Sequence, residues 1–170
     1  MRIELDSLEK GGEFAQTYQP DELKLGEPDV RLIEPVEIRG RLWKGNWEVN
    51  LAGRLSAKLE APCARCLKPV ALPIAAEFSE RFVPEVSWGS EEQHELHEED
   101  LDLAIFDGDA LEIDDVVREE LLLAVPTQVL CREDCKGLCP ACGVDRNATE
   151  CECETRQVDS RWQTLKDLRF

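Results

Sequence analysis

Eight cysteines, arranged as four close pairs, constrain the fold of this chain more than any other feature. A tetrahedral zinc site needs four thiolates about 2.3 Å from one ion, and two cysteines on one tight turn supply half of it at low entropic cost. The paired spacing therefore predicts two structural metal sites, each expected to hold Zn²⁺. The pairs are Cys63 and Cys66, Cys131 and Cys135, Cys139 and Cys142, and Cys151 and Cys153.

The pair with the strongest metal-binding signal lies in the run Leu138–Gly143. Pro140 fixes one backbone angle and Gly143 tolerates a positive φ, so this turn can aim both sulfurs at one ion. A disulfide framework is one alternative, but the first residues contain no apolar segment of signal-peptide length, which favours a reducing, cytoplasmic location. Thioredoxin-like redox chemistry at Cys63 and Cys66 is another, and the prolines on both sides of that pair disfavour it.

Three partitions of the four pairs into two sites are possible. Cys139 and Cys142 can join Cys151 and Cys153 across the eight residues 143–150, and such a short loop has a small closure entropy. We therefore expect the remaining site to combine Cys63, Cys66, Cys131 and Cys135. The rival partition groups Cys131, Cys135, Cys139 and Cys142.

Length and composition predict a single α+β domain over residues 1–170. The chain has 170 residues with 42% hydrophobic content, which can bury one core. No stretch approaches the roughly 20 apolar residues of a membrane span, so we expect no membrane association. The formal net charge of −17 makes the protein acidic, and on average it would repel nucleic acid.

Residue periodicity predicts an antiparallel β-sheet, a helix packed across it, a cysteine-rich tail and a short C-terminal helix. Alternating apolar residues favour two strands between Val30 and Cys63, joined through Lys44–Asn46. A further strand from Val70 to Phe82 contains or adjoins several prolines, which limit it to an edge or bulged position. The expected segments are 1–84 mainly β, 85–110 an acidic loop, 111–126 a helix, 130–153 a zinc-knuckle tail, and 159–168 a helix.

The acidic segment has two interpretations. A run so rich in Asp and Glu is typical of a solvated loop, or it forms a docking surface for a basic partner. Under the second interpretation, five glutamates are the candidate partner-binding residues. They are Glu91, Glu92, Glu95, Glu98 and Glu99.

Several motifs together resemble the YceD family, also called the large ribosomal RNA subunit accumulation proteins. They are Cys63-Ala64-Arg65-Cys66-Leu67, the helix ending Glu119–Pro126, Cys135–Gly143 with Asn147, Cys151-Glu152-Cys153, and Asp159–Trp162. Two departures occur: Val144-Asp145-Arg146-Asn147 follows Cys142-Gly143 where the family tends to read x-Asn-Leu-Asn, and Ser160 stands where Pro is usual. The resemblance implies a role in accumulation or processing of large-subunit ribosomal RNA, and it brings no known catalytic residues.

The sequence offers no convincing nucleophile, base or open metal position, so we expect no catalytic residues and no enzyme. The first hypothesis is an assembly factor that holds a basic ribosomal protein or maturation factor. The second is a zinc-knuckle module that binds ribosomal RNA directly, and the third is a thiol or zinc redox sensor. The RNA-binding hypothesis relies on cations near the cysteines, namely Arg65, Lys68, Arg132, Lys136 and Arg146.

Overall fold

The computed structural model describes residues 1–5, 11–45, 47–85, 103–106, 110–153 and 161. The chain forms two compact units. The first unit consists of Met1–Ala61 and Ala71–Thr127, and the second of Pro62–Val70 and Gln128–Phe170. The first unit contains the large hydrophobic core, whereas the second has a small cluster around Cys63, Cys66 and Cys135.

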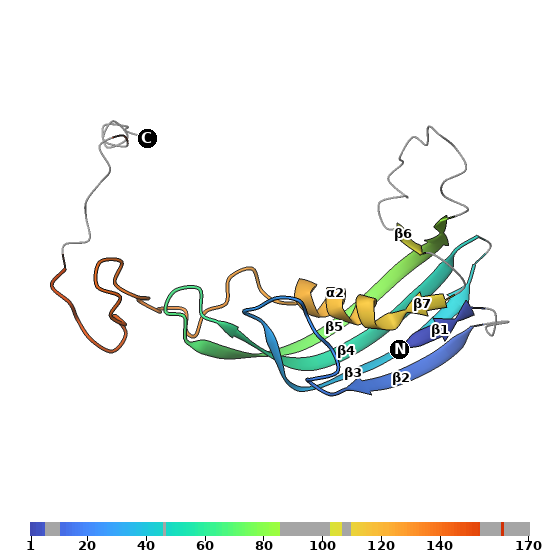
Figure 1. The fold of residues 1–170 in the computed structure, drawn as a ribbon, viewed down its shortest axis with the longest axis horizontal. Coiled ribbons are helices and arrows are strands. Elements are labelled where there is room, and N and C mark those ends of the chain that lie inside the picture. The colour runs from blue at the N-terminus through green and yellow to red at the C-terminus, as the bar shows by residue number, and fades with distance from the viewer. Residues whose placement is uncertain (6–10, 46, 86–102, 107–109, 154–160, 162–170) are drawn as a thin grey trace. The chain divides into compact units, whose positions relative to one another are not determined.

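A five-stranded sheet is the main element of the first unit (Figure 1). Its first three strands pair antiparallel, and β6 runs parallel to the last four residues of β5. Spatial order follows chain order: β2 (Gly12–Tyr18), β3 (Arg31–Lys44), β4 (Val49–Pro62), β5 (Pro69–Pro84) and β6 (Leu103–Phe106).

The predicted hairpin between Val30 and Cys63 is confirmed by β3 and β4. Lys44 lies opposite Val49, and the Gly45 N–H donates to the carbonyl of Glu48 at 2.7 Å. Alternate residues of both strands are buried, as the period of two predicts; among them Ile38 and Leu51 are at most 1% exposed.

Two glycines lie directly opposite each other in this hairpin. Gly40 pairs with Gly53, and a Cβ added at either position would lie within 2.8 Å of an aromatic ring, Phe14 or Phe78. The missing side chains therefore let the two rings pack against the sheet.

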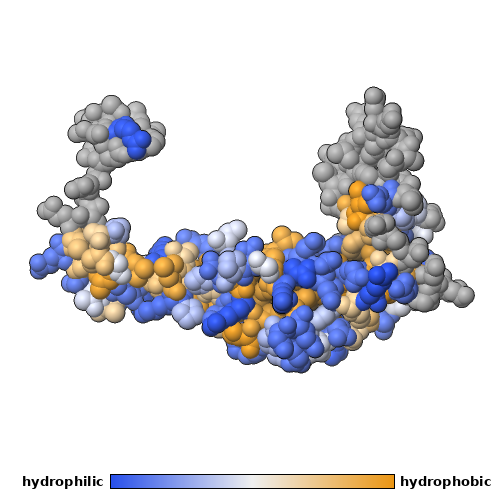
Figure 2. Space-filling view, viewed as in Figure 1, coloured by the Kyte–Doolittle hydropathy of each residue, from blue (hydrophilic) through white to orange (hydrophobic). Residues whose placement is uncertain are grey.

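One face of the sheet carries the helix α2 (Ile113–Leu123), as Figure 1 shows. Its buried residues share one hydrophobic cluster with those of the sheet, so this helix packs against the sheet. In the space-filling view of Figure 2, hydrophobic atoms remain visible between hydrophilic ones on this side. The buried residues are Ile113, Val116, Val117 and Leu121.

The helix is shorter than the predicted range 111–126. Leu111 belongs to strand β7 (Ala110–Glu112), which pairs antiparallel with β1 (Arg2–Glu4) and leads directly into α2. Asp114 and Asp115 occupy the first helical turn, where the helix dipole favours anions. The Tyr18 hydroxyl donates to Asp114 Oδ1 at 2.7 Å. Burial of Tyr18 raises the pKa of its hydroxyl, and this hydrogen bond adds to the effect.

Two further expectations need correction. The predicted acidic loop 85–110 contains strand β6, because the four apolar residues Leu103–Phe106 pair with Arg81–Pro84. The C-terminal end of β5 is therefore internal to the sheet, and not at its edge as expected. Pro69 and Pro73 lie outside the stretch that pairs with β6.

The predicted helix 159–168 lies outside the described residues, apart from Arg161. None of the helices in the described part is long and apolar enough to span a bilayer.

Candidate metal centres

The first cysteine tetrad combines Cys63 and Cys66 with Cys131 and Cys135, as the sequence favours. All four sulfurs lie within 4.8 Å of one another. Cys63 Sγ is 3.9 Å from Cys135 Sγ, and Cys66 Sγ is 3.6 Å from Cys131 Sγ. Three of the four residues are buried and Cys131 is exposed. The rival partition, in which Cys131 and Cys135 join Cys139 and Cys142, is therefore wrong.

The second tetrad consists of Cys139, Cys142, Cys151 and Cys153, whose sulfurs also lie within 4.8 Å of one another. Cys139 is buried, Cys142 is exposed, and the last two cysteines are half-buried. All eight cysteines of the chain are free thiols. The two tetrads can therefore each hold one metal ion.

The same turn geometry presents the first pair of each tetrad. The Cys63 N–H donates to the carbonyl of Lys68 at 2.8 Å, and the Cys139 N–H donates to that of Val144, also at 2.8 Å. The fifth residue of each turn has a positive φ, 60° at Leu67 and 75° at Gly143. This confirms the prediction for Gly143, whereas Leu67 adopts a conformation that non-glycine residues seldom do.

Gly137 brings the two cysteine-rich turns of the first tetrad together. Its φ is 71°, and a Cβ here would lie 2.9 Å from the Arg65 carbonyl oxygen. The next residue, Leu138, donates its N–H to the same oxygen at 3.0 Å. Glycine at this position therefore permits both the turn and the close approach.

Asn147 connects the first tetrad to the loop of the second. Its side-chain amide donates to Cys135 Sγ at 3.3 Å and to Asp145 Oδ1 at 2.7 Å. Its Oδ1 accepts from the Lys136 N–H at 2.8 Å. Hydrogen bonds of this kind orient a metal ligand and stabilise its thiolate form. The sequence pointed to Asn147 only through the family motif, because a single Asn has no spacing signal.

Three of the five cations predicted near the cysteines make contacts inside the second unit. Arg65 donates to the carbonyls of Glu133 and Cys135. Lys68 Nζ lies 2.6 Å from Asp145 Oδ2, and this ion pair lowers the pKa of Asp145 to about 2. Arg132 donates to Asn147 Oδ1 at 2.8 Å and pairs with Asp134 at 3.2 Å. Lys136 and Arg146 are exposed.

Ionisation is uneven within each tetrad. Burial opposes the charge on Cys63, but backbone N–H groups, chiefly that of Arg65, outweigh it and lower the pKa of this thiol to about 6. Burial and hydrogen bonds to neighbouring thiols, Cys135 first, raise the pKa of Cys131 to about 12.

The second tetrad shows the same contrast. The backbone N–H of Cys142 lowers the pKa of Cys139 to about 6, and a hydrogen bond to Cys142 raises that of Cys153 to about 12. A cation at the centre of either tetrad would balance the thiolate charges and displace the remaining protons.

The candidate partner-binding residues Glu91, Glu92, Glu95, Glu98 and Glu99 lie outside the described residues.

Comparison with known proteins identifies the family. Residues 51–169 match the family model described as "Large ribosomal RNA subunit accumulation protein YceD". The uncharacterized protein YlbN of Bacillus subtilis (strain 168) is 32% identical over 157 residues, which cover 92% of this chain and 87% of that protein.

Mycobacterial proteins are also similar. The uncharacterized protein Rv2926c of Mycobacterium tuberculosis is 31% identical over 120 residues, which cover 71% of this chain but only 55% of the relative. The uncharacterized protein ML1660 of Mycobacterium leprae is 25% identical over 134 residues, or 79% of this chain and 59% of the relative. No solved structure matches the chain. On the family match and the similarity to YlbN, the chain belongs to the YceD family, the large ribosomal RNA subunit accumulation proteins.

Proposed function

We propose that this protein is a non-enzymatic, cytoplasmic ribosome-assembly factor that supports accumulation or processing of large-subunit ribosomal RNA. The family match carries the proposal, because the family is described by large ribosomal RNA subunit accumulation. The family description names a process without a mechanism, so the molecular part must come from the chain's own chemistry.

Two closed zinc sites are the first molecular part of this proposal. Four thiolates with zinc–sulfur bonds of about 2.3 Å have sulfurs about 3.8 Å apart in a tetrahedron. The separations of 3.6 and 3.9 Å in the first tetrad support such a site. Soft thiolate ligands select Cu(I), zinc or iron–sulfur clusters among biological metals, and a tetrahedral set of four sulfurs points to zinc or iron–sulfur. Sulfurs this close suit a single ion better than a cluster of several irons.

The expected role of the metal is structural. In each tetrad the protein supplies all four ligands, which leaves no coordination position for substrate or water. The segment from Leu130 to Cys153 has one isolated β-bridge, between Leu138 and Asp145, and few buried apolar residues. Metal binding therefore supplies the free energy that orders this segment.

The proposed partner is a basic ribosomal protein or maturation factor. The chain has 37 acidic and 20 basic residues, and the run from Glu85 to Glu120 contains a single basic residue, Arg118. Ribosomal proteins that bind RNA are cationic, and an acidic partner attracts them and keeps them from premature RNA contacts.

Direct RNA binding through the zinc knuckles is the alternative. It has weaker support, because Arg65, Lys68 and Arg132 already contact neighbouring groups of the second unit. Only Lys136 and Arg146 of the five predicted cations are without such side-chain contacts among the described residues.

The test is affinity capture from cell extract with and without nuclease, followed by binding kinetics with purified large-subunit proteins. The test variant replaces Glu91, Glu92, Glu95, Glu98 and Glu99 with Gln. A charge-matched control replaces five exposed glutamates of other segments. These are Glu22, Glu27, Glu133, Glu150 and Glu152.

We expect nuclease-resistant capture of a cationic ribosomal protein, with an association rate that falls steeply with salt and is slowed by the test variant more than by the control. Equal slowing by both variants would show that net charge, not this segment, attracts the partner. Capture that disappears after nuclease treatment would contradict the protein-holding proposal and favour an RNA-binding function.

A further inference from the structure

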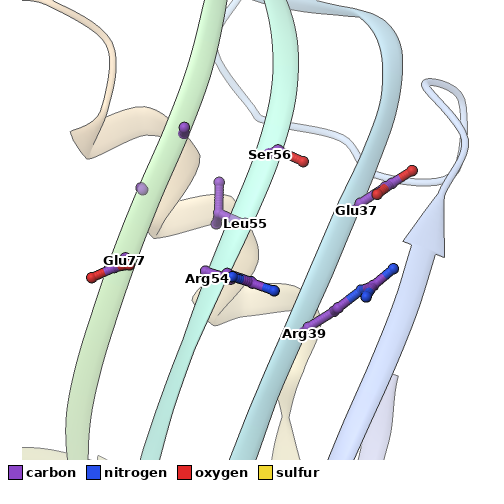
Figure 3. Close-up of a pocket in the computed structure, with 8 residues that line it drawn as sticks. Glu37, Arg39, Arg54, Leu55, Ser56 and Glu77 are labelled. Carbon is purple, nitrogen blue, oxygen red and sulfur yellow. The ribbon is translucent and has the colours of Figure 1, made fainter.

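The face of the sheet opposite α2 carries a group of arginines. Arg39 of β3 lies directly opposite Arg54 of β4, and Arg41 is the next outward residue along β3. All three are exposed. Figure 3 shows Arg39 and Arg54 on neighbouring strands of this open face, with α2 behind the sheet. We call Arg39, Arg41 and Arg54 the arginine face.

Among the described residues these arginines form no ion pair, although Glu13 lies opposite Arg41 across β2 and β3. Other cations of the same sheet are paired: Lys58 Nζ lies 2.6 Å from Glu34, and Arg81 lies 3.6 Å from Glu48. Like charges directly opposite each other across two strands destabilise a sheet. An arginine pair of this kind in a chain of net charge −17 therefore suggests an anion supplied from outside.

The surface around the arginine face is a pair of adjoining grooves. One has a volume of about 410 Å³ and is lined by residues that include Arg39, Arg54, Ser56 and Glu77. The other, of about 600 Å³, shares Arg39, Arg54 and Glu77 and extends to Arg41. Small outward residues leave the arginine side chains accessible along the grooves; they include Ala15, Ala52 and Ala75.

Arg41 is held on this face by an aromatic neighbour. Its guanidinium lies 4.7 Å from the centroid of the Trp43 ring, within the range of a cation–π contact. The contact keeps the charge over the sheet while leaving guanidinium N–H groups free to bind an anion.

We propose that the arginine face binds the phosphate backbone of single-stranded RNA. Guanidinium groups bind phosphate oxygens with two parallel hydrogen bonds, and open sheet surfaces accommodate single strands. Two glutamates, Glu37 and Glu77, line the first groove beside the arginines. Their carboxylates can accept hydrogen bonds from the amino groups of bases. The side chains of an acidic peptide have no such donors, so this mixture of charges favours RNA.

This RNA contact deepens the proposed function, on which it rests for the choice of ribosomal RNA as the natural ligand. The acidic segment would hold a cationic protein, and the arginine face would hold a strand of RNA. The arginine face belongs to the first unit, whereas the five cations that the sequence predicts near the cysteines belong to the second.

The experiment measures binding of a fluorescent single-stranded oligouridylate of about 12 nucleotides, a length within known site sizes, by fluorescence anisotropy over a range of salt concentrations. The test variant is Arg39→Gln with Arg54→Gln. The matched control is Arg2→Gln with Lys24→Gln, which removes the same charge from exposed positions elsewhere. Circular dichroism and thermal unfolding verify that both variants fold.

We expect the test variant to lose about tenfold or more in affinity, and the control much less, because two charge-assisted contacts are removed. The slope of log affinity against log salt should become shallower by about 1.4, from about 0.7 for each phosphate contact with a single strand. Trp43→Leu should lower affinity without an equal change in this slope.

Three results would overturn the proposal: no binding of RNA by the wild type, equal loss in test and control variants, or an unchanged salt slope. If a polyglutamate peptide binds the wild type when the RNA does not, and that binding is absent in the test variant, the ligand is an acidic protein. Any of these results leaves the proposed protein-holding function intact, because its test uses a different segment and a protein ligand.

Discussion

A carboxylate on the core-facing side of β5 should make the stability of the first unit depend on pH near neutrality. Glu80 continues the inward series of Ile74, Ala76 and Phe78, and it is half-buried. Burial raises its pKa to about 7, and the negative charges of Glu120 and Glu119 on α2 add to the effect. A hydrogen bond to Glu120 favours the protonated form of Glu80.

The direction of the pH effect follows from this raised pKa. The folded state holds the Glu80 proton more tightly than the unfolded chain, whose glutamates have their ordinary pKa of 4.5. The stabilisation is therefore complete below about pH 4.5 and is lost as pH rises through about 7. A pKa shift of one unit corresponds to about 1.4 kcal/mol, so the shift of Glu80 can change the unfolding free energy by at most about 3 kcal/mol. Solvent screening at a half-buried position reduces the expected effect to about 1–2 kcal/mol.

Glu80→Gln should remove this dependence. At pH 8 we expect the variant to be more stable than the wild type by about 1–2 kcal/mol, or about 2–8 °C in Tm for a chain of this size. At pH 5 the two should differ little, because Glu80 is then protonated. The matched control is Glu77→Gln, an exposed position on the opposite face of β5; an equally large difference there would trace the effect to net charge instead of to Glu80.

Urea unfolding and calorimetry at both pH values measure these differences, and comparison of the proteins at one pH cancels the contribution of the cysteine tetrads. An equal stability difference at pH 5 and pH 8 would refute the reasoning. So would a Glu80→Gln variant that is less stable than the wild type at pH 8.

Three further substitutions test the packing and the tetrads. Gly53→Ala should lower the unfolding free energy by about 1–3 kcal/mol in urea titration, because its Cβ would lie 2.8 Å from the Phe78 ring; an unchanged midpoint would contradict this. Leu67→Gly should raise stability by about 0.5 kcal/mol, since the exposed Leu67 has φ 60°, and a loss would show that its side chain packs. Cys139→Ser should expose Leu130–Cys153 to proteolysis while the sheet stays protected, and unchanged protection of that segment after metal removal would argue against a structural ion.

The partition of the cysteines could be predicted because it depends on short-range chain geometry. Cys139 and Cys151 are separated by a short loop, and the turn around Cys139 uses a proline and a glycine whose backbone preferences are known. The hairpin of β3 and β4 could be predicted equally well, because a period of two sets which side chains are buried. These features need no knowledge of which strands meet.

The arginine face and the carboxylate of Glu80 could not be predicted in this way. Arg39 and Arg54 become neighbours only in the register in which Gly40 lies opposite Gly53, and a shift of one residue would move them to opposite faces. Glu80 lies in an inward position that the pattern assigns to apolar residues, and its neighbours come from a helix far along the chain. Strand β6 was missed because four apolar residues within an acidic run give too short a signal.

The two proposed contacts have opposite charge requirements, and this difference gives the factor a selectivity that either contact alone would lack. A net charge of −17 repels free RNA over a Debye length of about 8 Å at physiological salt, so three arginines give only weak capture from solution. A cationic ribosomal protein held by the acidic segment would offset part of the negative charge of the chain and so weaken the repulsion of RNA strands. RNA binding should therefore be strongest when the protein partner is already bound, and the two together should bind more tightly than the product of their separate affinities predicts.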